Sequence, residues 1–151
     1  MGEKMKKTNL LFLVLGLIFF VGSATAQEDS GRPISATLTG AAEVPGPGDT
    51  DGAGTATIRL NQGKKQVCYE LSVSNIAAAT LAHIHRGGAT VSGPPVVTLE
   101  APADGTSSGC VENVSDELIK EIRQNPENFY VNVHNADFPN GAIRGQLSKG
   151  M

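Results

Sequence analysis

Aromatic side chains are scarce in this chain of 151 residues, which has no tryptophan, two tyrosines and five phenylalanines. Three of the phenylalanines lie within the first 20 residues, so only four aromatic side chains remain in the rest of the chain. A core of Val, Ile, Leu and Ala stabilises a small domain modestly, and such domains commonly gain stability from a covalent crosslink. The length suits one domain and not two.

Cysteine is also scarce, since the chain has only Cys68 and Cys110. The two are too far apart for the Cys-x-x-Cys spacing of redox motifs. We therefore predict one structural disulfide between them, in preference to a redox-active or metal-binding pair. In the chain-entropy model, a crosslink that closes a loop of about 43 residues stabilises a fold by about 4 kcal/mol.

Long hydrophobic runs are missing except near the N-terminus. Residues 10–21 are almost wholly apolar, follow three lysines and precede the small residues Ala-Thr-Ala at 24–26. This order is typical of a secretory signal peptide, and the run is shorter than the roughly 20 residues that span a membrane. We predict a signal peptide over 1–26, a short flexible N-terminus over 27–33 and a domain over 34–148. The mature protein would be secreted or periplasmic and have no transmembrane segment, and export favours the disulfide.

Positive charge is low in the predicted mature chain. Without the three lysines and one glutamate of the leader, nine basic and 14 acidic side chains leave a net charge of −5. Nucleic-acid binding depends on clustered Lys and Arg that neutralise phosphates. We therefore exclude nucleic acid as a partner.

Alternation of apolar and polar residues, the pattern of half-buried β-strands, dominates the mature chain. It predicts strands over residues 34–39, 55–60, 67–74, 81–85, 95–99, 129–134 and 143–147. Segments rich in Gly and Pro separate several of them, and residues 61–65 (NQGKK) fit a hairpin connection.

One segment has a helical pattern instead. Ser115 is a good N-cap for a helix over about 116–124, with Asp116 and Glu117 in its first turn and Pro126 just after its end. Short strands with a single helix predict a mainly β fold: an antiparallel, Greek-key-like β-sandwich of about seven strands with one short helix.

Catalytic motifs give no support for an enzyme. In a nucleophile elbow the reactive serine lies at a turn between a strand and a helix, and no helix follows a candidate nucleophile in this sequence. The acidic residues near predicted strands, Glu43 among them, are not paired in the way that glycoside hydrolysis needs. We therefore predict that the protein is not an enzyme.

All three histidines of the chain fall in two short motifs. His83 and His85 form an H-x-H pair, which in a strand places both rings on one face about 6.7 Å apart. His134 ends another predicted strand and shares its face with Tyr130 and Asn132. If these strands are neighbours, three imidazoles converge and could hold Cu(II) or Zn(II) with a fourth position open. The alternative is a hydrogen-bonded structural network.

Five segments carry distinctive motifs: 38–45 (LTGAAEVP), 82–89 (AHIHRGGA), 93–99 (GPPVVTL), 130–134 (YVNVH) and 139–146 (PNGAIRGQ). Arg144 belongs to the last of them, where it could bind a carboxylate or hold the C-terminal strand onto a neighbour. Together these segments resemble the CHRD domain, the module named after chordin. Family members often have Thr in place of Asn135 and Glu in place of Ala142, and the second difference removes a carboxylate that could pair with Arg144.

The resemblance implies a β-rich exported module of the stand-alone bacterial type. We expect a non-catalytic module that binds a protein or surface partner outside the cytoplasm. In this hypothesis the histidines, with Glu43, Tyr130, Asn132 and Arg144, shape one end of the sandwich. The alternative is a small mononuclear copper or zinc protein that uses the three histidines.

Overall fold

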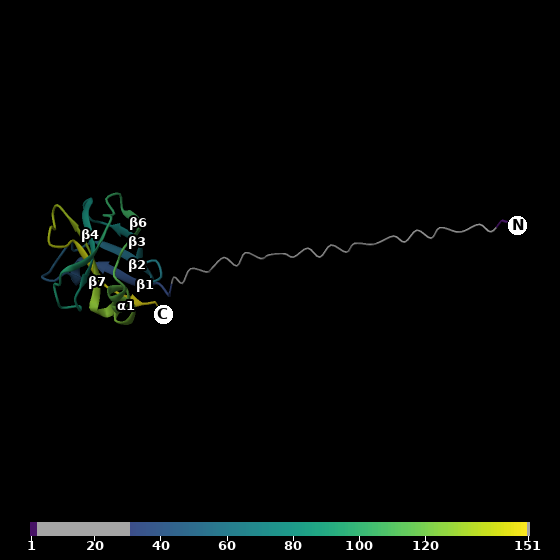
Figure 1. Cartoon of the computed structure of the whole chain (residues 1–151). Helices are drawn as coiled ribbons and strands as arrows, with labels where there is room; N and C mark the ends of the chain where they lie inside the picture. The colour runs from purple at the N-terminus through teal and green to yellow at the C-terminus, as the bar shows by residue number, and fades with distance from the viewer. Residues whose placement is uncertain (3–30, 151) are drawn as a thin grey trace.

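The computed structural model describes residues 1–2 and 31–150, so the predicted signal peptide lies outside the described residues except for Met1 and Gly2. Within the described chain the fold is mainly β, with one α-helix and two short 3-10 helices marked η (Figure 1). The elements are β1 (Ile34–Thr39), η1 (Gly40–Ala42), β2 (Ala53–Asn61), β3 (Gln66–Ser74), β4 (Ala79–Arg86), β5 (Pro95–Leu99), β6 (Thr106–Val111), α1 (Asp116–Gln124), η2 (Pro126–Asn128), β7 (Phe129–Asn135), β8 (Ile143–Gln146) and β9 (Ser148–Lys149).

The strands form one antiparallel sheet in the order β5-β4-β7-β8-β1-β2-β3-β6, and β9 pairs with β1. The halves of this order are β5-β4-β7-β8 and β1-β2-β3-β6, and the chain passes between them four times: from β3 to β4, from β5 to β6, from β6 through α1 to β7, and from β8 to β9 beside β1. Such returns are typical of Greek-key topology. The end strands β5 and β6 also contact each other, so the sheet is a sandwich that nearly closes into a barrel.

The core lies between the two halves of the sheet. Apolar side chains from both halves belong to one cluster, including the fully buried Leu38 and Ile58 from one half and Ile84, Val131 and Ile143 from the other. Alternation places these residues on the inner face of each strand. The predicted mainly β sandwich with one α-helix is therefore confirmed.

The expected count of about seven strands is too low, because β6 and β9 were not predicted. β6 has the sequence TSSGCV, in which most side chains are exposed, so no hydrophobic alternation marks it. β9 has only two residues, which is too short for a pattern. β6 has a hydrogen-bonded neighbour on one side only, β3.

Cys68 and Cys110 lie directly opposite each other in β3 and β6, and a disulfide joins them. The crosslink therefore attaches the edge strand to the rest of the sheet. None of the described helices is long and apolar enough to cross a membrane.

α1 has the predicted bounds and lies at the same end of the domain as the C-terminal residues (Figure 1). The Ser115 side chain accepts a hydrogen bond from the Leu118 amide at 3.2 Å, and Ile119 and Ile122 bury the apolar face of the helix.

Substitution of Ser115 by Ala is expected to lower the free energy of unfolding by about 1 kcal/mol, because one amide of the first turn loses its acceptor. Urea unfolding measures this change. Ser92→Ala, at an exposed loop position, is the control. A loss for Ser115→Ala no larger than that of the control would contradict the capping role.

Candidate functional site

The outer faces of β4, β7 and β8 carry polar side chains that are mostly buried, although they point away from the core. Tyr130 and Arg144 are each 1% exposed, and Asn132 is 4% exposed. The residues that we call the outer polar layer are His83, His85, Tyr130, Asn132, His134, Arg144 and Gln146. Three loops supply the groups that contact this layer: the one from η1 to β2, the one from β4 to β5 and the one from β7 to β8.

Strand register brings the three histidines together. β4 lies beside β7, with His83 opposite Asn132, His85 opposite Tyr130 and Leu81 opposite His134. His134 is therefore a diagonal neighbour of His83, within reach of its side chain. One ligand nitrogen from each ring lies within 4.8 Å of those from the other two.

Two backbone carbonyls determine which ring nitrogens are free. His85 Nδ1 is 2.9 Å from the Gly93 oxygen, and His134 Nδ1 is 3.0 Å from the Pro139 oxygen. A carbonyl oxygen only accepts hydrogen bonds, so each Nδ1 carries the proton and each neutral ring has its lone pair on Nε2. The Nε2 atom of His134 lies 3.4 Å from Nδ1 of His83.

Burial lowers the pKa of His83, His85 and His134, and repulsion between the rings lowers the pKa of His83 and His85 further. The backbone hydrogen bonds to His85 and His134 act in the opposite direction but are the smaller effect. All three rings are therefore neutral at pH 7, the form that binds metal ions.

Tyr130 lies between a histidine and an arginine. Its ring stacks on His85 with centroids 4.9 Å apart, and the Arg144 guanidinium carbon lies 3.5 Å from the Tyr130 centroid. Arg144 Nη2 also donates to the Gly88 carbonyl at 2.8 Å, and the Tyr130 hydroxyl accepts from the Gly93 amide at 3.1 Å. These contacts hold the glycine-rich β4–β5 loop over the layer.

Glu43, from the segment just after η1, reaches the layer although it is 89 residues from its partner. Its Oε2 accepts from Asn132 Nδ2 at 3.0 Å. A Cβ atom at Gly141 would overlap the Glu43 carboxylate in its present position, and the φ of +138° at Gly141 is one that side-chain-bearing residues rarely adopt. Burial raises the pKa of Glu43 to about 7, against the lowering effects of Asn132, of the nearby charge of Arg144 and of the Val44 amide. The chain thus has a carboxylate near Arg144, although Ala142 lacks the one that family members often have.

Gln146 is the member of the layer that sequence reasoning missed. Its Nε2 lies 2.7–2.8 Å from the carbonyl oxygens of Gly87, Glu127 and Phe129. Its position two residues after Arg144 was the available signal, because alternation puts both on one face.

Buried polar atoms that lack a hydrogen-bond partner cluster in and beside this layer. Among the described residues, five buried side-chain atoms lack a hydrogen-bond partner, four of them in the layer and one on Glu43, which contacts it. They are Glu43 Oε1, His85 Nε2, Asn132 Oδ1, Arg144 Nη1 and Gln146 Oε1. Buried polar atoms without a partner are rare, and a cluster of them points to a ligand or ordered water.

A serine pattern elsewhere does not form a nucleophile elbow. Residues 105–109 read G-T-S-S-G, but Thr106 to Gly109 are part of the edge strand β6 and not of a turn between a strand and a helix. Ser107 donates its hydroxyl hydrogen to the Glu100 carbonyl at 2.7 Å.

The fold and the disulfide define a small β-rich module of the kind found outside cells. A family model, that of the CHRD domain, matches residues 34–147, and the chain belongs to this family. No curated protein matches the chain. Membership in this family fits a non-enzymatic, extracellular module.

Proposed function

We propose that this exported, non-catalytic module binds a single Cu(II) or Zn(II) ion on His83, His85 and His134. The convergence of three ring nitrogens within 4.8 Å is the observation that carries the proposal. Imidazole suits both metals, and three protein ligands leave one coordination position for water or another ligand.

The spacing of the nitrogens fits this use. Two nitrogens bound to one tetrahedral Zn²⁺ at about 2.0–2.1 Å lie about 3.3–3.4 Å apart. Nδ1 of His83 and Nε2 of His134 are 3.4 Å apart. We therefore assign Nδ1 of His83, Nε2 of His85 and Nε2 of His134 as the three ligand atoms.

The surroundings of the histidines support the same assignment. A metal-bound histidine commonly donates its other ring N–H to a carbonyl or carboxylate, which fixes the ring. Gly93 and Pro139 supply such carbonyls to His85 and His134. His85 Nε2 is buried without a hydrogen-bond partner, and metal coordination would use its lone pair.

A protein or surface partner is the second candidate, and one observation favours it. Leu81 lies opposite His134 and is 51% exposed, which is unusual for a large apolar side chain in the described part of this chain. An apolar residue beside the histidines would suit a docking contact near the ligand site. This candidate is compatible with metal binding.

Calorimetric titration of the untagged, exported protein with Cu(II) and with Zn(II) tests the metal proposal. We expect a 1:1 complex with a Kd below about 1 μM. The first variant is His83→Ala, because His83 is only half-buried and hydrogen-bonds to no backbone group, so its loss should leave the fold intact. It should weaken binding at least 100-fold.

Thr98→Ala is the matched control, because Thr98 is exposed and lies directly opposite His83 in β5. It should bind as the wild type does. The chain has no other histidine, so imidazole nitrogen couplings in the Cu(II) electron paramagnetic resonance spectrum report this cluster alone. Absence of binding, or equal affinity of His83→Ala and wild type, would show that the histidines are architectural.

A further inference from the structure

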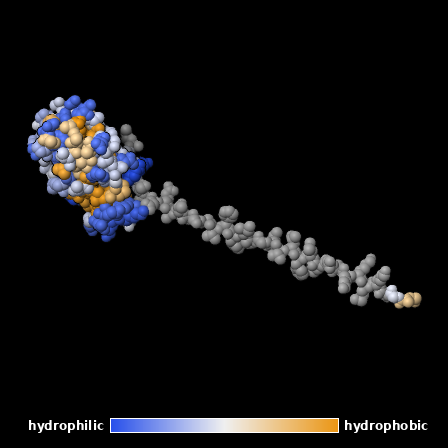
Figure 2. Space-filling view, turned by 90° about the horizontal axis from the view of Figure 1, so that it is seen from above, coloured by the Kyte–Doolittle hydropathy of each residue, from blue (hydrophilic) through white to orange (hydrophobic). Residues whose placement is uncertain are grey.

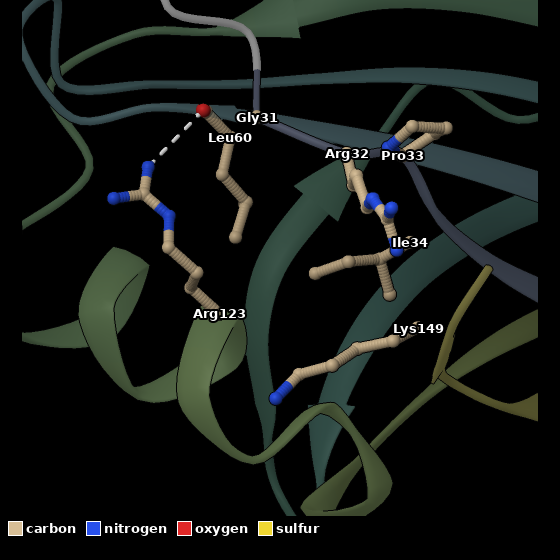
Figure 3. A pocket seen from close by; sticks show the side chains of 7 residues that line it. All are labelled: Gly31, Arg32, Pro33, Ile34, Leu60, Arg123 and Lys149. Carbon is tan, nitrogen blue, oxygen red and sulfur yellow. Dashed lines mark hydrogen bonds between the residues drawn. The ribbon is translucent and has the colours of Figure 1, made fainter. Parts of the chain in front are cut away.

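A pocket lies away from the outer polar layer, at the end of the domain where α1 and β9 meet the start of β1. Its volume is about 160 Å³, and its lining includes Arg32, Pro33, Ile34, Leu60, Arg123 and Lys149. Figure 3 shows Leu60 and Arg123 on one side of a central space and Arg32 and Ile34 on the other, with Lys149 running below Ile34 and the Arg123 guanidinium turned toward the Leu60 carbonyl. None of the lining residues belongs to the layer described above.

Three positive charges border this pocket, and none of the described residues that line it is acidic. The concentration is notable because the predicted mature chain has only nine basic side chains and a net negative charge. The three cations come from separate parts of the fold: Arg32 from the segment before β1, Arg123 from α1 and Lys149 from β9. The fold, and not a local run of charge, brings them together.

Hydrogen bonds to the protein position two of the cations and leave donors unused. Arg123 donates to the Leu60 carbonyl at 3.3 Å and to Gln62 Oε1 at 3.1 Å, and Lys149 donates to the Gln124 carbonyl at 3.0 Å. A guanidinium has five N–H donors and an ammonium has three, so each keeps donors for a ligand. Arg32 has no hydrogen-bond or ion-pair partner among residues 31–150.

The floor of the pocket is apolar. Ile34 and Leu60 belong to the core and are only 4% and 3% exposed, and the exposed Pro33 adds apolar surface to the lining. On the space-filling surface, strongly hydrophilic side chains adjoin hydrophobic ones near the start of the described domain (Figure 2). A ligand that matches both features has an anionic head and an apolar body.

We propose that this pocket binds a carboxylate with a short aliphatic tail. The carboxylate would accept hydrogen bonds from Arg32 and Arg123, and the tail would lie against Pro33 and the exposed edges of Ile34 and Leu60. Arg is suited to the head group because its planar fork matches a carboxylate in bidentate geometry. The volume is below the 300–1,000 Å³ or so of sites for drug-sized ligands, which limits the ligand to a small molecule.

The chain itself offers a competing carboxylate. Glu28 and Asp29 precede Arg32 by only a few residues in the sequence. The same pocket chemistry would accept either a free carboxylate or one of these side chains. The test must therefore separate the two sources.

Titration of the exported protein with hexanoate, followed by amide NMR shifts of residues around Ile34, tests the proposal. We expect saturable binding, with 1-hexanol at least tenfold weaker because it lacks the charge. Arg32→Gln and Arg123→Gln should each weaken hexanoate binding about tenfold. Arg59→Gln, which removes an exposed arginine of β2 outside this pocket, should leave it unchanged.

Three outcomes would overturn the proposal. The first is no saturable binding of hexanoate. The second is equal affinity for hexanoate and hexanol, which would show a purely apolar site. The third is binding only in a Glu28→Gln, Asp29→Asn double variant, which would show that the chain's own carboxylates fill the pocket. Because no histidine is involved, failure here leaves the metal proposal unaffected.

Discussion

Removal of the Cys68–Cys110 disulfide, by reduction or by Cys68→Ser with Cys110→Ser, is expected to lower the free energy of unfolding by about 4 kcal/mol. The two cysteines are 42 residues apart, so the crosslink closes a long loop and reduces the number of conformations that the unfolded chain can adopt. Small domains have total stabilities of about 5–15 kcal/mol, so the loss is a large share. Urea unfolding with and without reductant measures it.

Removal of the disulfide should also destabilise β6 more than the rest of the sheet. β6 has a hydrogen-bonded neighbour on one side only and buries few apolar side chains, so without the crosslink it has little to hold it on β3. Amide hydrogen exchange in β6 should therefore accelerate more than exchange in β2. The double variant serves as the control for reductant, to which it should be insensitive. A loss under about 1 kcal/mol would show that the sheet holds β6 without the crosslink.

The elements that could be predicted are those with a local signal. β1, β2, β3 and β7 alternate over six or more residues, and α1 has a cap, acidic residues in its first turn and a proline after its end. β6 has no such signal because its place is set by pairing with β3 and by the disulfide. Its prediction would have required the register of a strand some 40 residues earlier.

The site could be predicted only in part, for a similar reason. The H-x-H spacing of His83 and His85 is local, and it correctly places both rings on one face. The position of His134 depends on β7 lying beside β4, which the sequence left as a condition. The contact of Glu43 with Asn132 joins residues 89 positions apart, and no pattern in the sequence predicts it.

Glu43 should make the stability of the domain fall as the pH rises from about 4.5 to about 7. Burial raises the pKa of its carboxyl group from 4.5 to about 7 in the folded protein. Between these values the folded protein keeps the proton and the unfolded chain has lost it, so each pH unit lowers the free energy of unfolding by about 1.4 kcal/mol. The contribution is fully present below pH 4.5 and is lost as the pH passes through 7, which totals about 3 kcal/mol.

Glu43→Gln isolates this effect, because glutamine keeps an oxygen that can accept from Asn132 Nδ2 but does not titrate. The histidines have lowered pKa values and therefore make stability rise with pH up to about 6.5, the opposite direction, but they do so in both proteins. The difference in free energy of unfolding between wild type and variant, measured with urea, should thus fall by about 3 kcal/mol between pH 4.5 and pH 8.

Glu70→Gln, on the exposed face of β3, is the control and reports the effect of removing an acidic charge that is not buried. A constant difference between wild type and Glu43→Gln across this range would mean that the folded domain holds Glu43 as a carboxylate throughout, with Arg144 outweighing the cost of its burial.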